Sequence, residues 1–310
     1  MNILVTGGAG YIGSILVPEL LKEGNNVTVL DNFYYKQSSL IDCCKYKTFS
    51  IINGDVNDEE VPKKAVEVAD LIYPLAALVG FPVCDKNKIT AINTNLKAIE
   101  KLLAIREPSQ KIIFPCTNSG YGLGQGQQYC TEESPITPIS LYGKTKMEAE
   151  RIILESGNSV TLRFATLFGA SPRMRTDLLV NDFVYRAVFD RSLIVFEGSF
   201  MRNYLHVRDA ASALMFAKDN FEAMKGQTFN CGLDEANMSK LELCAVIKKF
   251  IPDFTYMEAP IGKDPDQRNY IVSNEKIKSY GFKTECSLED GIQELIKTYS
   301  IIKNSAYGNV

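Results

Sequence analysis

The chain is 310 residues long, is 45% hydrophobic and carries a formal net charge of -3. This length favours two lobes, or one large α/β unit with a smaller cap, and the charge argues against a nucleic-acid surface or a polybasic membrane anchor. The N-terminus lacks the basic start and apolar run of a secretory signal, and no apolar run of about 18 residues follows, so we expect a cytoplasmic protein without a membrane partner.

The first predicted elements are a strand, a glycine-rich turn and a helix. Residues 2–6 form a short apolar run, which is followed by Gly7-Gly8-Ala9-Gly10-Tyr11-Ile12-Gly13 and by helical periodicity over residues 12–23. Such glycines allow a tight turn and close approach of the backbone to a pyrophosphate, which the helix N-terminus then faces. Pro18 lies inside this helix, so we expect a bend there.

A carboxylate ends the second predicted strand, at residues 26–30. Asp31 lies 18 residues beyond Gly13, about where an acidic side chain binds the adenosine ribose hydroxyls of a dinucleotide. The same carboxylate would repel a 2'-phosphate. It therefore favours NAD over NADP, although Lys36 lies nearby in the sequence.

Two further strands are expected at residues 49–53 and 70–74. Asp55 and Val56 follow the first, and Asp55 is equally compatible with a turn carboxylate and with an adenine contact. The second runs into Leu75-Ala76-Ala77, whose small residues suit a loop that passes close to a cofactor. Residues 89–105 have helical periodicity and include Asn93.

The next strand, at residues 111–116, ends in Thr117-Asn118-Ser119-Gly120-Tyr121-Gly122. Loops at the carboxyl ends of parallel strands build the ligand site, so the Thr117 hydroxyl is placed to meet a substrate. A capped turn rich in Thr, Asn and Gly is an equally good interpretation. Strands alternate with helices through residues 160–164, which predicts an α/β fold with a doubly wound parallel sheet.

Tyr142 and Lys146 lie four residues apart on a predicted helix. This spacing places both side chains on one face, one turn apart, where the ammonium can lie near the phenol. A nearby cation favours the phenolate, and a lowered pKa would let the tyrosine act as a general base. The alternative is an ordinary exposed helix face.

The alternation ends beyond Gly169. A basic loop at residues 171–175 contains Arg173 and Arg175, and later loops contain Arg202 and Arg268. Loop arginines can clamp phosphates, though most are merely solvated. Helices are expected at residues 177–189, 239–250, 273–280 and 288–302, and the tail after Lys303 is expected to fray. Eight cysteines without a C-x-x-C pair and the single His206 argue against a zinc site.

Together these motifs, in this order, resemble the extended short-chain dehydrogenase/reductase family of nucleotide-sugar enzymes over nearly the whole chain. The resemblance implies a Rossmann domain at residues 1–168 with a return segment near 203–232, and a nucleotide-sugar-binding lobe at 169–202 and 233–310. It implies NAD as cofactor, no metal, and a homodimer formed through the helices near 89–105 and 141–156. The apolar side chains of those helices (Leu96, Ile99, Leu103, Met147, Ile153 and Leu154) could equally be core.

The resemblance also assigns roles to single residues. Tyr142, Lys146 and Thr117 are expected to be catalytic. Cofactor contacts are expected from Gly7, Gly10, Tyr11, Ile12, Gly13, Asp31, Asn32, Asp55, Val56, Leu75, Ala76, Ala77, Asn93, Tyr142 and Lys146. Substrate contacts are expected from Asn118, Ser119, Thr166, Arg173, Arg175, Arg202 and Arg268, with Arg202 and Arg268 on the diphosphate; His206 is expected to be structural.

The implied reaction is hydride transfer from C4 of a nucleotide-diphosphate sugar to NAD, with the Tyr142 phenolate as base, Lys146 beside it and Thr117 on the same hydroxyl. Family dehydratases place an Asp-Glu pair where Asn118 and Ser119 stand, and 3,5-epimerases place a Cys at position 119, so both reactions are disfavoured. A 4-dehydrogenase and a 4-epimerase remain open. Thr166 replaces the asparagine of typical UDP-galactose epimerases, so the substrate is expected to differ from UDP-galactose.

Residues 117–122 and 171–183 look most like a bacterial surface-polysaccharide branch that includes GDP-heptose 4-dehydrogenases. That likeness favours a GDP-linked sugar. A catalytically silent NAD-binding regulator is the alternative from another functional class, and the combination of Tyr142, Lys146 and Thr117 argues against it.

Overall fold

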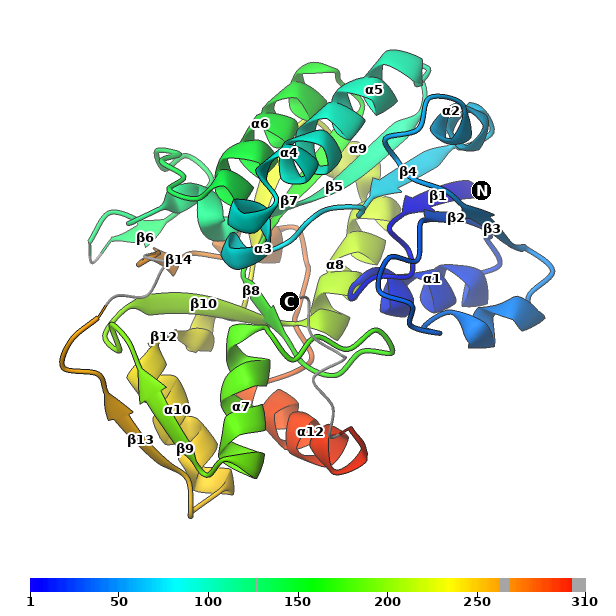
Figure 1. Ribbon diagram of the computed structural model, residues 1–310. Helices are drawn as coiled ribbons and strands as arrows, with labels where there is room; N and C mark the ends of the chain where they lie inside the picture. Colours follow the sequence, from blue (N-terminus) through cyan, green and yellow to red (C-terminus); the bar gives the residue numbers. More distant parts are fainter. Residues whose placement is uncertain (127, 263–267, 303–310) are drawn as a thin grey trace.

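Seven parallel strands form the central sheet, in the order β11-β7-β5-β4-β1-β2-β3 (Figure 1). The structure is a computed structural model that describes residues 1–126, 128–262 and 268–302. The strands are β1 (Asn2–Thr6), β2 (Asn26–Asp31), β3 (Phe49–Asn53), β4 (Leu71–Pro74), β5 (Lys111–Thr117), β7 (Ser159–Phe164) and β11 (Thr228–Cys231). The predicted doubly wound parallel sheet is confirmed.

The sheet reverses its direction of growth between β1 and β4. The chain passes from β1 to β2 and β3 on one side and then crosses to β4, β5 and β7 on the other. Because all strands are parallel, the segments that follow β1 and β4 emerge at the same edge. Ligands of such sheets bind at this reversal point, beyond the carboxyl ends of the strands.

Side chains of β1 alternate between two cores. Ile3 and Val5 pack with residues of α1 (Gly13–Lys22) and α8 (Val207–Asp219), and Leu4 packs on the opposite face. That face is covered by α2 (Glu60–Glu67), α5 (Ala98–Ile105) and α6 (Leu141–Glu155), which lie together above the sheet in Figure 1. All three β1 side chains are at most 1% exposed, so the strand is buried on both faces, as parallel strands usually are.

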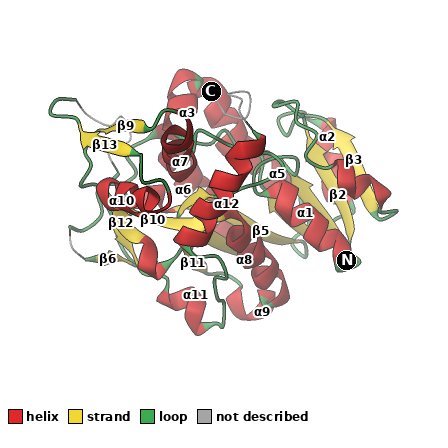
Figure 2. Ribbon diagram, turned by 90° about the horizontal axis from the view of Figure 1, so that it is seen from below, coloured by secondary structure: helices red, strands yellow, loops and turns green. Residues whose placement is uncertain are grey.

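A second lobe lies below the sheet in Figure 1 and has its own core. Its elements are α7 (Leu179–Phe189), β9 (Ser192–Val195), α10 (Lys240–Phe250), β13 (Thr255–Glu258) and α12 (Leu288–Ile301), and Figure 2 shows α7, α10 and α12 gathered there. Short strands β8 (Thr166–Phe168), β10 (Met201–His206) and β12 (Asn237–Ser239) run beside it. Between β10 and β12 the chain returns to the sheet through α8, which packs on α1, and through β11.

Small elements complete the chain. They are α3 (Phe81–Lys86), α9 (Phe221–Met224), α11 (Glu275–Ser279) and the strand pair β6 (Tyr129–Cys130) and β14 (Ile271–Val272). The predicted helices at 177–189, 239–250, 273–280 and 288–302 are present as α7, α10, α11 and α12 with shifted ends. The tail beyond 302 lies outside the described residues.

Two segments differ from expectation. The helix expected at 89–105 consists of α4 (Lys88–Ile92), a π-helical turn at Asn93–Lys97, and α5. The segment around Arg202, interpreted as a loop, contains strand β10, which pairs with β8 and β12. Five of its six residues are buried, including polar ones, so its sequence lacks the alternation that identifies a half-buried strand.

The helices expected to form a dimer interface bury many of their apolar side chains in the core of the same chain. Ile99, Met147 and Ile153 are buried in the core beneath α5 and α6, and Leu96 and Leu103 pack against it partly buried. Pro18 lies inside α1, as predicted, and the bend at this residue stays a prediction. Across the described ranges, no helix is long and apolar enough to cross a bilayer.

Candidate active site

The glycine-rich turn begins directly after β1 and lies against the segment after β4. Gly7 has φ +68°, which favours glycine, and a Cβ atom built on it would lie 2.6 Å from the Ala76 backbone. The Gly7 backbone can therefore approach Ala76 only because it has no side chain. Helix α1 begins at Gly13, so its first free N–H groups and positive dipole end point toward the space beyond the sheet.

Asp31 ends β2 and is fixed by two backbone donors. Ala9 N–H donates to Oδ2 at 3.0 Å and Phe33 N–H donates to Oδ1 at 2.8 Å. Burial raises the pKa of this carboxyl, while these two hydrogen bonds oppose the rise. The carboxylate is thereby tied to the glycine-rich turn. Asn32, beside it, donates to Asp55 Oδ2 at 2.8 Å.

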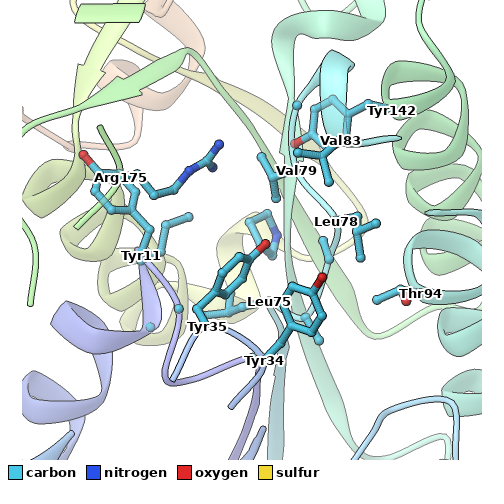
Figure 3. A pocket seen from close by; sticks show the side chains of 18 of the residues that line it. Tyr11, Tyr34, Tyr35, Leu75, Leu78, Val79, Val83, Thr94, Tyr142 and Arg175 are labelled. Atoms are coloured by element: carbon cyan, nitrogen blue, oxygen red, sulfur yellow. The ribbon is translucent and has the colours of Figure 1, made fainter. Parts of the chain in front are cut away.

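A cavity of about 750 Å³ joins these elements to α6. This volume is typical of ligand pockets. Figure 3 shows Tyr34 and Tyr35 at one end, Leu75 and Leu78 along the wall, and the Tyr142 ring at the other end. One continuous space therefore runs from the carboxylate after β2 to the predicted catalytic pair.

Tyr142 and Lys146 are held by α6, whose start is capped. Ser140 precedes the helix, and its Oγ accepts a hydrogen bond from Gly143 N–H at 3.1 Å. Farther along, Glu150 pairs with Arg163 of β7, with Nη2 and Oε1 2.7 Å apart and both side chains buried. The cap and this ion pair fix the position of the helix relative to the sheet.

Lys146 is buried beneath the cavity and its ammonium stacks on an aromatic ring. Its Nζ lies 3.8 Å from the centroid of the Phe114 ring. Burial lowers the pKa of Lys146 to about 8. Phe114 is the residue that sequence reasoning missed here, because its position in an apolar strand gave no sign of contact with a cation.

The Tyr142 phenol does not have the lowered pKa that its spacing from Lys146 suggested. Burial raises its pKa above the ordinary value, and the positive charges of Arg175 and Arg268 oppose that rise. In the protein alone, burial therefore outweighs the neighbouring cations. The two arginines act on the phenol although they are distant in sequence, which spacing on a single helix could not show.

Thr117 lies at the end of β5 and is part of a hydrogen-bonded chain. Its Oγ1 accepts from Ser119 N–H at 3.1 Å and donates to Ser119 Oγ at 2.9 Å. Ser119 Oγ also accepts a hydrogen bond from Arg268 Nη1. The hydroxyl of Thr117 must therefore turn away from Ser119 before it can donate to a substrate oxygen. The capped turn and the cavity position, offered as alternatives, occur together.

Most residues expected in the site line this one cavity. They include Gly7, Gly10, Tyr11, Ile12, Gly13, Asp31, Asn32, Asp55, Val56, Leu75, Ala76, Ala77, Thr117, Ser119, Tyr142, Lys146, Thr166, Arg173, Arg175 and Arg268. Thr166 Oγ1 is buried and, among the described residues, has no hydrogen-bond partner. That hydroxyl is available to a ligand.

Three expected contacts do not line the cavity. Asn93 is exposed on the π-helical turn, and Asn95, two residues later, is the buried amide that bonds both backbone groups of Leu78. Asn118 is fully buried. Arg202 is 1% exposed and donates to Met201 O at 3.0 Å. The direct contacts expected from these three residues stay predictions.

His206, expected to be structural, is the last residue of β10 and caps the start of α8. Its Nε2 lies 2.6 Å from Glu294 Oε2, and its Nδ1 accepts from Arg208 N–H at 3.2 Å. The ring is fully buried outside the cavity. It links α8 to α12.

The model of the NAD dependent epimerase/dehydratase family matches residues 3–232. The chain belongs to this family. Its relatives include a UDP-glucose 4-epimerase of Lactobacillus helveticus, 31% identical over 86% of this chain and 87% of that protein. The low-salt glycan biosynthesis protein Agl12 of Haloferax volcanii is 28% identical over 96% of this chain and 98% of its own length.

Solved structures of similar fold include the UDP-glucose 4-epimerase of Thermotoga maritima with UDP-glucose. It is 25% identical, covers 97% of this chain and 99% of its own, and has a TM-score of 0.81. As a member of this family, the protein is an NAD-dependent enzyme of the nucleotide-sugar epimerase/dehydratase group. The Gly7 turn, the α1 N-terminus and Asp31 fit a dinucleotide in shape and chemistry.

Proposed function

We propose that the enzyme oxidises the C4 hydroxyl of a nucleotide-diphosphate sugar. One observation carries this proposal: Tyr142, Lys146 and Thr117 line the same cavity as the dinucleotide turn. Within the described residues, the carboxylates that line this cavity are Asp31, the last residue of β2, and Asp55, which follows β3, and both lie at the opposite end from Tyr142. A dehydratase needs an acid and a base beside the sugar, whereas hydride transfer needs one base.

The chain's own residues divide the work of oxidation. Tyr142 takes the proton of the sugar hydroxyl at its phenol oxygen, and Thr117 holds the same hydroxyl. NAD, held by the glycine-rich turn, the α1 N-terminus and Asp31, would supply the hydride acceptor and a positive charge, and a nearby cation lowers the pKa of a phenol. Lys146, stacked on Phe114 under the cavity, stabilises the phenolate that this requires.

The product depends on where the hydride goes next. If it leaves the site, the product is a 4-keto sugar and the enzyme is a 4-dehydrogenase, as the likeness to GDP-heptose 4-dehydrogenases suggested. If it returns to the other face of C4, the enzyme is a 4-epimerase. The 31% identical relative named a UDP-glucose 4-epimerase favours this second candidate.

One experiment can identify both the nucleotide of the substrate and the product. The likeness of residues 171–183 favours a GDP-linked hexose or heptose, while the relative and the structure named above carry UDP in their names. The purified enzyme should be incubated with GDP- and UDP-sugars and NAD, with absorbance followed at 340 nm and products identified by NMR. A C4 stereoisomer without net NADH indicates the epimerase, and a 4-keto sugar indicates the dehydrogenase.

A protein that binds NAD but converts no nucleotide sugar would contradict the proposal and support the silent regulator.

We further propose that the sheet domain binds NAD and the second lobe binds the nucleotide sugar. We also propose a homodimer through α4, α5 and α6, since Ile89 and Ile92 of α4 are 78% and 37% exposed. Light scattering during gel filtration would show a dimer, and an Ile89→Asp variant that remains dimeric would contradict this interface.

A further inference from the structure

We propose that Arg173, Tyr35 and Gln37 form a clasp that holds NAD, whereas the family resemblance placed Arg173 on the nucleotide sugar. This inference rests on the proposed function only in requiring NAD as the cofactor. The three residues come from two loops, at 32–39 after β2 and at 169–175 after β8, and all three line the cavity.

Arg173 stacks directly on the loop after β2. Its guanidinium carbon lies 3.7 Å from the centroid of the Tyr35 ring, and the side chain is 2% exposed. Burial raises the pKa of Asp31, and the positive charge of Arg173 is one of the groups that oppose this rise. Arg173 therefore lies at the Asp31 end of the cavity, where Figure 3 shows Tyr35, and not at the Tyr142 end.

The loop that carries Arg173 is fastened to the glycine-rich turn. Ser171 Oγ donates to Tyr11 O at 2.8 Å and lies 2.9 Å from Ser14 Oγ. Tyr11 Oη donates to Gly169 O at 2.6 Å. These bonds place the loop beside the N-terminus of α1, which is where a dinucleotide diphosphate binds in this class of sheet.

Gln37 supplies a second, independent observation. Both its Nε2 and its Oε1 are buried, and neither has a hydrogen-bond partner among the described residues. Two residues later, Ser39 Oγ donates to Ala9 O at 2.8 Å, so this loop also returns to the glycine-rich turn. A buried amide without partners is costly, and a ligand that offers hydroxyl donors and phosphate oxygens would satisfy it.

The clasp has a consequence for the reaction. Dissociation of NAD is slow because the Gln37 amide loses its hydrogen-bond partners when NAD leaves, and because the buried Arg173 guanidinium loses its attraction to the diphosphate. With resident NAD, release of NADH does not complete the cycle, so the hydride either returns to a sugar carbon or passes to a second acceptor that enters the site. Without such an acceptor the net reaction is redox-neutral, which favours the epimerase.

The test measures retention of NAD in the absence of any sugar. Wild-type enzyme, Arg173→Met and the control Arg151→Met, an exposed residue on α6, are loaded with NAD and passed through gel filtration. Bound NAD and its dissociation constant are then measured. We expect wild type and control to retain NAD, and Arg173→Met to bind it about ten- to a hundredfold more weakly, the range for a hydrogen bond to a charged group.

Two further variants keep the test decisive. Arg173→Lys preserves the charge without the planar stack, and we expect an intermediate loss of affinity if Arg173→Met does not fold. Gln37→Met replaces the buried amide with an apolar side chain of similar size. We expect it to raise the thermal stability of the NAD-free protein and to weaken NAD binding, a combination that a purely structural residue would not give.

Normal NAD retention by Arg173→Met, with a raised KM for the nucleotide sugar, would overturn the clasp and return Arg173 to the substrate. Wild-type enzyme that loses NAD as fast as the variant would overturn it as well. Because these measurements contain no sugar, they stand apart from the proposed C4 oxidation, whose failure would appear only as absent turnover in enzyme that holds NAD.

Discussion

Replacement of Lys146 by Met should stabilise the protein at neutral pH while it removes catalysis. In the folded chain, burial lowers the pKa of Lys146 to about 8, whereas an unperturbed lysine titrates at about 10.4. Below pH 8 the folded protein must keep a buried ammonium, which the unfolded chain solvates freely. Met has similar length and can keep contact with the Phe114 ring without a charge.

The size and sign follow from linkage. When the pKa of a lysine is lower in the folded state than in the unfolded state, the lysine destabilises the folded state. This destabilisation is complete at pH values below the folded-state pKa and disappears at pH values above the unfolded-state pKa. The difference between these pKa values corresponds to about 3 kcal/mol. Lys146→Met should therefore raise the free energy of unfolding by up to about 3 kcal/mol below pH 8, and the gain should fade between pH 8 and about 10.5.

Urea unfolding of NAD-free protein at four pH values between 6.5 and 10.5 would measure this gain. The control is Lys144→Met, an exposed lysine on the same helix, whose free energy of unfolding should change little at any of these pH values. A gain that does not depend on pH, or a loss of stability at pH 7, would refute the assignment of a desolvated ammonium to Lys146.

Three other changes test the site. Tyr142→Phe should abolish turnover yet bind NAD as wild type does, and loss of NAD binding, measured by equilibrium dialysis, would count against a purely catalytic role. Gly7→Ala should destabilise the fold by more than Gly24→Ala does, and thermal unfolding would measure the difference. Both glycines have positive φ, which costs about 1–2 kcal/mol for a residue with a side chain. Only at Gly7 would the added Cβ lie 2.6 Å from backbone atoms. Ser119→Ala should raise KM for the nucleotide sugar, because Arg268 loses a partner, and lower kcat less than about tenfold, because the Thr117 hydroxyl remains; steady-state kinetics with an unchanged KM would contradict this role of Ser119.

The sheet could be predicted because its signals are local. Each strand of the central sheet corresponds to an apolar run bounded by a turn. The fold also requires certain spacings, and these are found for the glycine-rich turn, Asp31, and the pair Tyr142 and Lys146. The order of these signals along the chain was enough to place the site at the carboxyl ends of the strands.

The second lobe and the fine structure of the site could not be predicted in this way. Strand β10 places Arg202, Asn203 and His206 in buried positions, so its polar sequence resembled a loop. Asn93 and Asn95 look alike in sequence, and only the π-helical turn decides which of them is buried. The pKa of Tyr142 depends on Arg175 and Arg268, whose positions are set by tertiary contacts.

The arrangement of positive charges gives a reason for two separate basic loops. A site that binds NAD and a nucleotide sugar together must hold two diphosphates, and each needs its own donors if the sugar is to exchange while the cofactor stays. Arg173 lies on Tyr35 beside the glycine-rich turn, whereas Arg268 donates to Ser119 beside Thr117. If these arginines serve the cofactor and the sugar respectively, loss of Arg268 should weaken sugar binding without releasing NAD, and loss of Arg173 should do the reverse.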